Sequence, residues 1–111
     1  TIFYSKKTGR KGSHSRHVCI FAEGELDRSP TGTGVSARAA LLAKKEGLAI
    51  GRNVIIESIT AGEMTVTIQS TLDYFGNKAV IPRVSGRAFI TGNHQFLLDK
   101  NDIFPQGFLL R

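Results

Sequence analysis

The chain has 111 residues, with 15 Lys or Arg, 9 Asp or Glu, 12 Gly and one Cys, and its formal net charge is +6 at pH 7. This length suits one compact domain, and an apolar content of 41% excludes a disordered or collagen-like chain. A single cysteine excludes an internal disulfide framework, and no apolar run approaches the roughly 20 residues that cross a bilayer. We therefore expect a soluble, cytoplasmic protein with no membrane partner.

The positive charge is concentrated at the start of the chain. The first 16 residues carry +5 and the other 95 carry +1. The basic residues of this segment are Lys6, Lys7, Arg10, Lys11 and Arg16. Such a segment is able to reach nucleic acid phosphates, but residues 5–16 hold no aromatic side chain that would stack on a base. We interpret residues 5–16 as a basic, solvated loop and do not expect nucleic acid as a partner.

The first half of the chain predicts two strands and one helix. Residues 2–4 are a short apolar stretch, and residues 17–22 have the length and composition of a buried strand. A turn is predicted over residues 25–30. Residues 33–45 predict a helix that is apolar around most of its circumference and ends before Gly47. Such a helix has to be buried on nearly all sides.

The second half has the composition of strands separated by short turns. Strands are predicted over residues 53–59, 64–69, 78–84, 87–91 and 94–98. Their short connections favour antiparallel neighbours, and Pro82 indicates an edge strand or a bulge. Residues 102–111 are apolar enough to pack against the body. One helix and about six mostly antiparallel strands predict an α+β fold, with a curled sheet around a central helix.

Residues 27–34, with the sequence DRSPTGTG, lie between a predicted strand and the helix. Glycines let the backbone approach a ligand closely, and the amide N–H groups and dipole of a helix N-terminus favour an anion. A carboxylate or a phosphate is the expected ligand. The same residue types also suit an ordinary helix cap, in which Thr31 or Thr33 caps the helix and Asp27 closes an Asx turn.

Two other kinds of site are weighed against this one. Residues 32–37 match the dinucleotide fingerprint G-x-G-x-x-A, and Glu57 stands about where a ribose-binding acid belongs. Nine residues separate the end of the preceding strand from these glycines, however, and hairpins follow instead of βαβ units, so we do not favour a dinucleotide. The candidate metal ligands, His14, His17, Cys19 and His94, have no recognised spacing, so no metal is expected. Cys19 is expected to be a small core residue.

The string DRSPTGTG, followed by an Ala-rich helix, resembles the second signature of the proline racemase family, whose usual form is DRSPCGTG. Gly92 and residues 102–110 are similar to that family's closing segment, so the resemblance covers about residues 16–111. It implies the diaminopimelate-epimerase-like fold, in which two similar halves bind a ligand between two helix N-termini. Residues 1–111 would then be a single domain and most of the C-terminal half. The position of Met64, the only methionine, also indicates that an N-terminal part is missing.

Thr31 stands where racemases and 4-hydroxyproline epimerases of this family carry their second catalytic cysteine. A thiol with a pKa near 8.5 can exchange a Cα proton, whereas an aliphatic hydroxyl is far too weak an acid. One remaining cysteine, in the missing half, suits elimination, and a Thr here resembles the trans-3-hydroxy-L-proline dehydratases, which form 1-pyrroline-2-carboxylate. The alternatives are a proline racemase or 4-hydroxyproline epimerase and, in another class, a non-catalytic binding module with a basic arm.

The resemblance also assigns roles to individual residues. Thr31 would be catalytic, Asp27 would accept a hydrogen bond from the ring ammonium, and the amides of Gly32 and Thr33 would bind the substrate carboxylate. The expected partners are proline or hydroxyproline, the missing N-terminal half and a second copy in a homodimer, with no cofactor. The chain by itself is expected to be inactive.

Overall fold

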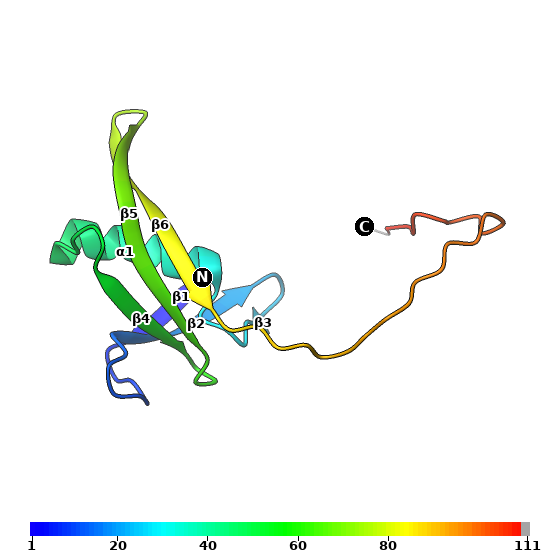
Figure 1. Cartoon of the computed structure of the whole chain (residues 1–111), viewed down its shortest axis with the longest axis horizontal. Coiled ribbons are helices and arrows are strands. Elements are labelled where there is room, and N and C mark those ends of the chain that lie inside the picture. Colours follow the sequence, from blue (N-terminus) through cyan, green and yellow to red (C-terminus); the bar gives the residue numbers. More distant parts are fainter. Residues whose placement is uncertain (110–111) are drawn as a thin grey trace.

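The computed structural model describes residues 1–109, which contain one helix and six strands (Figure 1). In chain order these are β1 (Ile2–Ser5), β2 (Ser15–Phe21), β3 (Glu25–Leu26), α1 (Gly32–Glu46), β4 (Asn53–Ser58), β5 (Glu63–Tyr74) and β6 (Asn77–Gly86). The predicted α+β class is therefore confirmed. The turn expected over residues 25–30 contains the short strand β3, and β2 begins two residues earlier than predicted.

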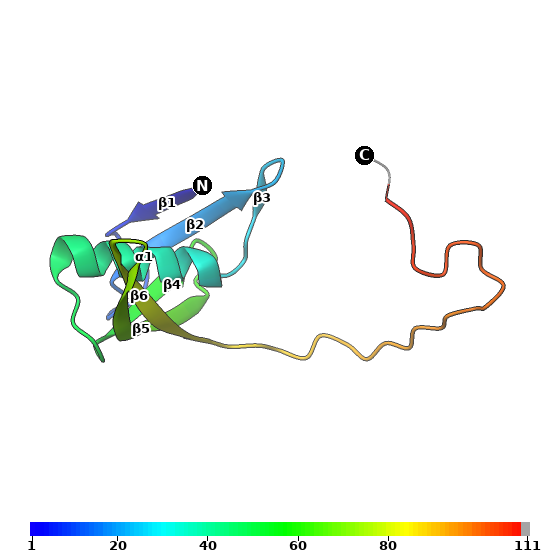
Figure 2. The same ribbon diagram turned by 90° about the horizontal axis from the view of Figure 1, so that it is seen from above.

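The strands form one curled sheet in the order β1-β2-β4-β5-β6, with β3 paired to β2 outside this path. Every neighbouring pair is antiparallel except β2 and β4, because the connection between these two strands is the crossover that contains α1. Seen from above, β1 and β2 lie on one side of α1 and β4 to β6 on the other (Figure 2). This agrees with the predicted sheet curled around a central helix.

One face of α1 packs against the concave side of the sheet. The buried core residues are Val35, Ala39, Leu42, Val54, Ile56, Val66 and Ile68. The helix ends at Gly47, whose φ of 65° is the left-handed conformation that this position requires, as predicted. The expectation of burial on nearly all sides is wrong, because the sheet ends at β1 and β6. Ala37, Ala40 and Leu41 lie on the uncovered face and are exposed.

The predicted strands over residues 87–91 and 94–98 are wrong. After Gly86 the described chain leaves the body as an extended segment without regular structure (Figures 1 and 2). Its apolar side chains are in solvent, as the 93% exposure of Ile90 and the 88% exposure of Phe96 show. The expected packing of residues 102–111 is likewise wrong over 102–109, and residues 110–111 lie outside the described chain. An apolar, β-branched pattern favours a strand only where another strand pairs with it.

Pro82 lies on the edge strand β6, opposite Ile68 of β5, and the register shifts between Ile68 and Ser70. The prediction of an edge or a bulge at Pro82 is confirmed, since a residue without an N–H is tolerated where no further strand needs a donor. Residues 1–109 include no helix that is long and apolar enough to span a membrane.

Candidate functional site

The loop of residues 27–31 is held by hydrogen bonds to Asp27. The N–H and the hydroxyl of Ser29 donate to Asp27 Oδ1 at 2.9 and 3.1 Å, and the Thr31 hydroxyl donates to Asp27 Oδ2 at 2.7 Å. The first of these bonds closes an Asx turn, as the simple capping interpretation predicts. Thr31 is the N-cap residue by position, but its side chain makes no capping hydrogen bond. The capping role considered for the Thr31 side chain is therefore wrong.

Because no side chain caps α1, its first amides are free. Val35 N–H is the first to bond within the turn, to Thr31 O at 2.8 Å. The N–H groups of Gly32, Thr33 and Gly34 have no acceptor among residues 1–109. These three donors and the positive end of the helix dipole are the features that bind an anion at a helix N-terminus.

A hollow of about 480 Å³ lies beside this helix end. Its lining residues are Thr1, Ile2, Cys19, Ile20, Phe21, Asp27, Thr31, Thr33 and Gly34. The structure thus brings Asp27, Thr31 and Thr33 together, as the sequence predicted, and Gly32 lies between the two threonines in the chain. The wall formed by Cys19 and Phe21 was not predicted. Alternating burial along β2 from Ser15 to Cys19 places Cys19 on the buried face, and a period of two was the available signal for it, whereas Phe21 is exposed.

Gly34 allows β1 and β2 to approach the helix end closely. A Cβ at this position would lie 2.9 Å from Cys19 Sγ and 3.0 Å from Ile2 Cδ1, closer than side chains tolerate. Cys19 itself is only 5% exposed and is a core residue, as predicted. The hollow therefore has an apolar wall next to the free amides and the polar residues of the loop.

The polar side of the hollow is charged and conformationally strained. The hydrogen bond from the Thr31 hydroxyl, followed by that from the Ser29 N–H, holds the pKa of Asp27 below its usual range. Asp27 is therefore a carboxylate at neutral pH. Thr31 has a φ of 66°, which is rare and strained for a β-branched residue. Backbone strain of this kind is concentrated at functional sites.

Glu57, the ribose-binding candidate, is fully buried and holds the basic loop instead. Its Oε2 accepts hydrogen bonds from the N–H groups of Gly9 and Arg10 at 3.0 and 3.1 Å, and its Oε1 accepts one from Arg16 Nε at 2.9 Å. Burial raises the pKa of Glu57, but the hydrogen bonds from Arg16 and the two amides outweigh it, so the pKa lies below its usual value. We call these four residues the Glu57 clasp.

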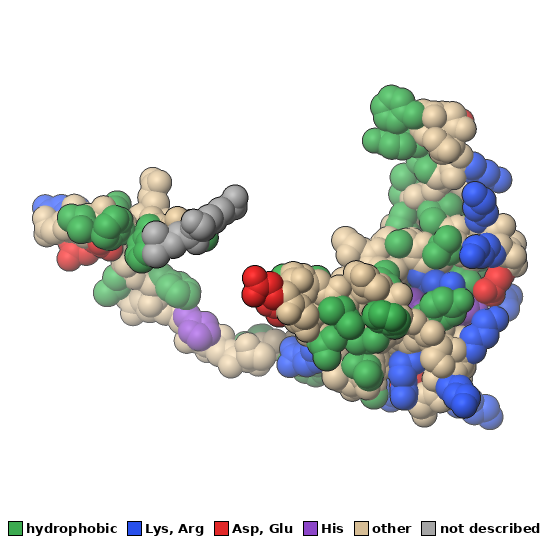
Figure 3. All heavy atoms as spheres, turned by 180° about the vertical axis from the view of Figure 1, so that it is seen from behind, with side chains coloured by type: hydrophobic (Ala, Val, Ile, Leu, Met, Phe, Trp, Pro, Cys, Tyr) green, Lys and Arg blue, Asp and Glu red, His purple; other side chains and the backbone are tan. Residues whose placement is uncertain are grey.

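The clasp changes the interpretation of residues 5–16. Arg16 is paired with Glu57, and Arg10 forms an ion pair with Glu63 at 2.8 Å. The segment is therefore attached to the sheet and is not a free basic arm. Basic side chains still gather along one side of the molecule, interrupted by acidic residues (Figure 3).

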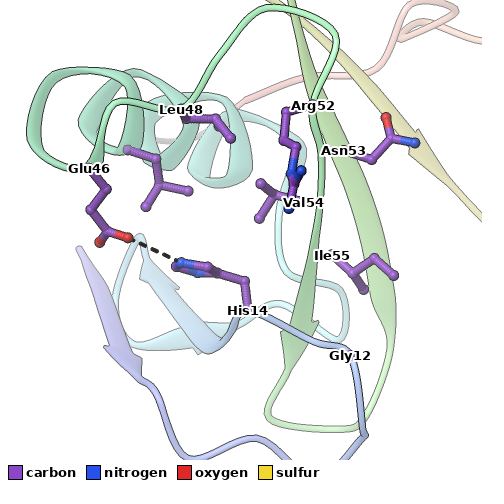
Figure 4. A pocket seen from close by; sticks show the side chains of 9 residues that line it. Gly12, His14, Glu46, Leu48, Arg52, Asn53, Val54 and Ile55 are labelled. Atoms are coloured by element: carbon purple, nitrogen blue, oxygen red, sulfur yellow. Dashed lines mark hydrogen bonds and ion pairs between the residues drawn. The ribbon is translucent and has the colours of Figure 1, made fainter.

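A second hollow, of about 390 Å³, lies at the opposite end of α1 (Figure 4). His14 and Glu46 face each other there, with 3.4 Å between Nε2 and Oε2. The negative end of the helix dipole and the carboxylate of Glu46 disfavour an anion at this end. Within the described part of the chain, no group of three or more His, Cys, Asp or Glu residues is arranged to hold a metal ion.

Fold and site together define an α+β domain with a ligand-sized hollow at the N-terminus of its central helix. The sequence model of the family described as proline racemase matches residues 1–109, and the chain belongs to the proline racemase family. It is 57% identical over 111 residues to a protein of Shewanella pealeana and covers 32% of that relative. It is 48% identical over 98 residues, 88% of the chain, to a trans-3-hydroxy-L-proline dehydratase of Colwellia psychrerythraea and covers 28% of it.

A solved structure is similar over nearly the whole chain. The crystal structure of a hydroxyproline epimerase from Agrobacterium vitis, with bound trans-4-hydroxy-L-proline, matches 98% of this chain with a TM-score of 0.76 and 35% identity. The chain covers 30% of that protein. The likeness confirms the diaminopimelate-epimerase-like fold, and the chain spans about a third of the length of the relatives that it matches.

Proposed function

We propose that this chain supplies the carboxylate-binding half of the active site of a trans-3-hydroxy-L-proline dehydratase, and that residues 1–111 are most of its C-terminal half. One observation carries the proposal. The Thr31 hydroxyl, hydrogen-bonded to the Asp27 carboxylate, lies beside the free helix amides, at the position where, by resemblance, the family's two-thiol enzymes have a cysteine. The 48% identity to the Colwellia dehydratase supports the same reaction.

The hollow has the chemistry to bind a cyclic amino acid. The free amides of Gly32 and Thr33 would donate hydrogen bonds to the substrate carboxylate and would stabilise charge that develops at Cα. The Asp27 carboxylate would accept a hydrogen bond from the ring ammonium. Ile2 and Phe21 offer apolar surface to the methylene side of the ring.

The proposed reaction is an elimination. A base outside this chain, by resemblance a cysteine thiolate of the first half, removes the Cα proton, and the electron pair forms a Cα–Cβ double bond as the 3-hydroxyl leaves. In the trans isomer the 3-hydroxyl lies on the same face of the ring as the Cα proton, so the thiol that has taken this proton would pass it to the leaving hydroxyl and complete one water molecule. The resulting enamine tautomerises to 1-pyrroline-2-carboxylate. The only hydroxyl proton of Thr31 is directed at Asp27. This favours a positioning role for Thr31, which would hold the Asp27 carboxylate toward the ring ammonium.

The second candidate is a 4-hydroxyproline epimerase or proline racemase, which the Agrobacterium structure favours. Either activity requires a group on each face of Cα that takes and returns a proton. The hydroxyl of Thr31 cannot do so near neutral pH, since its pKa is far above that of a thiol. A non-catalytic binding module with a basic arm is less well supported, because Arg10 and Arg16 are paired with Glu63 and Glu57.

The test uses the full-length protein. Incubation with trans-3-hydroxy-L-proline should give 1-pyrroline-2-carboxylate and water, and incubation with L-proline in D₂O should give no D-proline. Pyrrole-2-carboxylate, a planar analogue of the deprotonated substrate, should inhibit. Thr31→Ala should lower the dehydration rate, whereas the matched control Thr33→Ala should keep most of it, because only the amide of Thr33 is used. Racemisation of L-proline without dehydration would refute the proposal in favour of the second candidate.

A further inference from the structure

Two hydroxyl groups support the site loop from behind. Ser58, the last residue of β4, is fully buried, and its hydroxyl donates to the backbone carbonyl of Arg28 at 2.8 Å. The Thr60 hydroxyl donates to the same carbonyl and lies 2.9 Å from Ser58 Oγ. Both lone pairs of the Arg28 oxygen are therefore occupied by side chains of the β4–β5 turn.

The turn is shaped to approach the loop closely. Gly62 donates its N–H to Ser58 Oγ at 3.0 Å. A Cβ on Gly62 would lie 3.1 Å from Ser58 Oγ and 3.4 Å from the Arg28 oxygen, so a larger residue would press on this contact. We call Ser58, Thr60 and Gly62 the bracket.

The supported carbonyl belongs to the peptide group whose N–H holds Asp27. The C=O of Arg28 and the N–H of Ser29 share one planar trans peptide, so they point in opposite directions. On the far side, that N–H donates to Asp27 Oδ1 at 2.9 Å. Fixing the carbonyl therefore fixes the direction of the N–H, and hydrogen bonds that polarise the carbonyl strengthen the bond that the N–H donates.

We propose that Ser58 and Thr60 are positioning residues for the candidate site: through the Arg28–Ser29 peptide they hold the Asp27 carboxylate, and with it the Thr31 hydroxyl, toward the hollow. Neither residue lines the hollow. The inference rests on the proposed function only in the substrate-binding role given to Asp27. The hydrogen bonds themselves do not depend on which substrate binds.

The test is a ¹³C NMR titration of the Asp27 carboxyl in the chain and its variants. In Ser58→Ala combined with Thr60→Val the Arg28–Ser29 peptide is released, and the pKa of Asp27 should rise because the hydrogen bond from the Ser29 N–H is weakened. Thr60→Val alone should give a smaller rise, and Thr60→Ser, which keeps the hydroxyl, should give none. The charged group that acts on Asp27, Arg28, is unchanged in every variant.

Thr67→Val is the matched control. Thr67 is buried in β5 and donates its hydroxyl to Asn53, so this change removes a hydrogen bond from the sheet and leaves the Arg28–Ser29 peptide intact. It should lower stability without moving the pKa of Asp27. Thr60 is exposed, so its variants remain informative if Ser58→Ala does not fold. A pKa of Asp27 that is the same in folded Thr60→Val and in the folded double variant as in the parent would overturn the inference.

A second measurement separates this inference from the proposed function. In the full-length protein, the double variant should bind pyrrole-2-carboxylate severalfold more weakly, because the Asp27 carboxylate is no longer held toward the hollow, and Thr67→Val should bind it normally. If the parent protein does not bind this compound but the pKa of Asp27 still responds to the bracket, the proposed function fails and the positioning role stands. Equal weakening of binding in Thr67→Val and the double variant would refute the positioning role.

Discussion

Replacing Glu57 with Gln tests whether a buried carboxylate fixes the basic loop to the sheet. Oε2 of Glu57 accepts the two loop amides, whereas Oε1 accepts the guanidinium of Arg16. If the side-chain oxygen of Gln takes the place of Oε2, it keeps the hydrogen bonds from both loop amides. Its NH₂ group then faces Arg16, so a charge-assisted hydrogen bond is replaced by two opposed donors.

The magnitude follows from the bonds that are lost. A hydrogen bond to a charged group contributes about 1.5 to 3 kcal/mol, and breaking a buried ion pair costs about 3 to 5 kcal/mol. The guanidinium of Arg16 is partly in solvent, with 35% of its side chain exposed, which reduces the second figure. We expect Glu57→Gln to lower the free energy of unfolding by about 2 to 4 kcal/mol at pH 7.

Urea denaturation at several pH values measures this loss, with Glu63→Gln as the matched control. Glu63 pairs with Arg10 of the same loop but is 34% exposed, so its loss should cost less than about 1 kcal/mol. Because the pKa of Glu57 is lowered in the folded chain, its contribution is present above the unfolded pKa, and it is lost as the pH falls through the folded value. Equal costs for the two substitutions at pH 7 would refute the reasoning.

Four further outcomes are expected. Asp27→Asn should weaken substrate binding by about 1.5 to 3 kcal/mol, measured by calorimetry on the full-length protein, whereas a change in Tm alone would favour a structural role. Thr31→Cys places a thiol at a helix N-terminus, where its thiolate is favoured, and should produce epimerase or racemase activity at the expense of dehydration. An unchanged dehydration rate with no inverted product would show that Thr31 does not lie beside Cα on the face opposite the base. Burial, then the charges of Arg38 and His14, lowers the pKa of His17 from 6.5 to about 4. The unfolded chain therefore binds the extra proton, and stability should fall by up to about 3 kcal/mol between pH 6.5 and 4, a slope that His17→Gln should remove. The chain alone should show no dehydratase activity, because its single thiol is buried and its hollow is open to water.

Local patterns predicted the central helix, its end at Gly47 and the position of the site loop. These features depend on residues that are near one another in sequence. The strands expected over residues 87–91 and 94–98 failed because strand propensity says nothing about whether a partner is present. The Glu57 clasp and the bracket could not be predicted either. Each joins residues at least 30 positions apart, and the parallel pairing of β2 with β4 sets the register that places Arg16 beside Glu57.

The extended segment after β6 has a practical consequence for handling the molecule. Every core residue and every residue that lines the hollow beside the helix N-terminus precede Gly86. Residues 87–109, in contrast, expose many large apolar side chains, a surface that favours self-association at millimolar concentration. A chain that ends at Gly86 would keep the sheet, the clasp and the bracket and would lose the exposed apolar side chains of residues 87–109. It would be the shorter unit to prepare for spectroscopy when the chain of 111 residues precipitates.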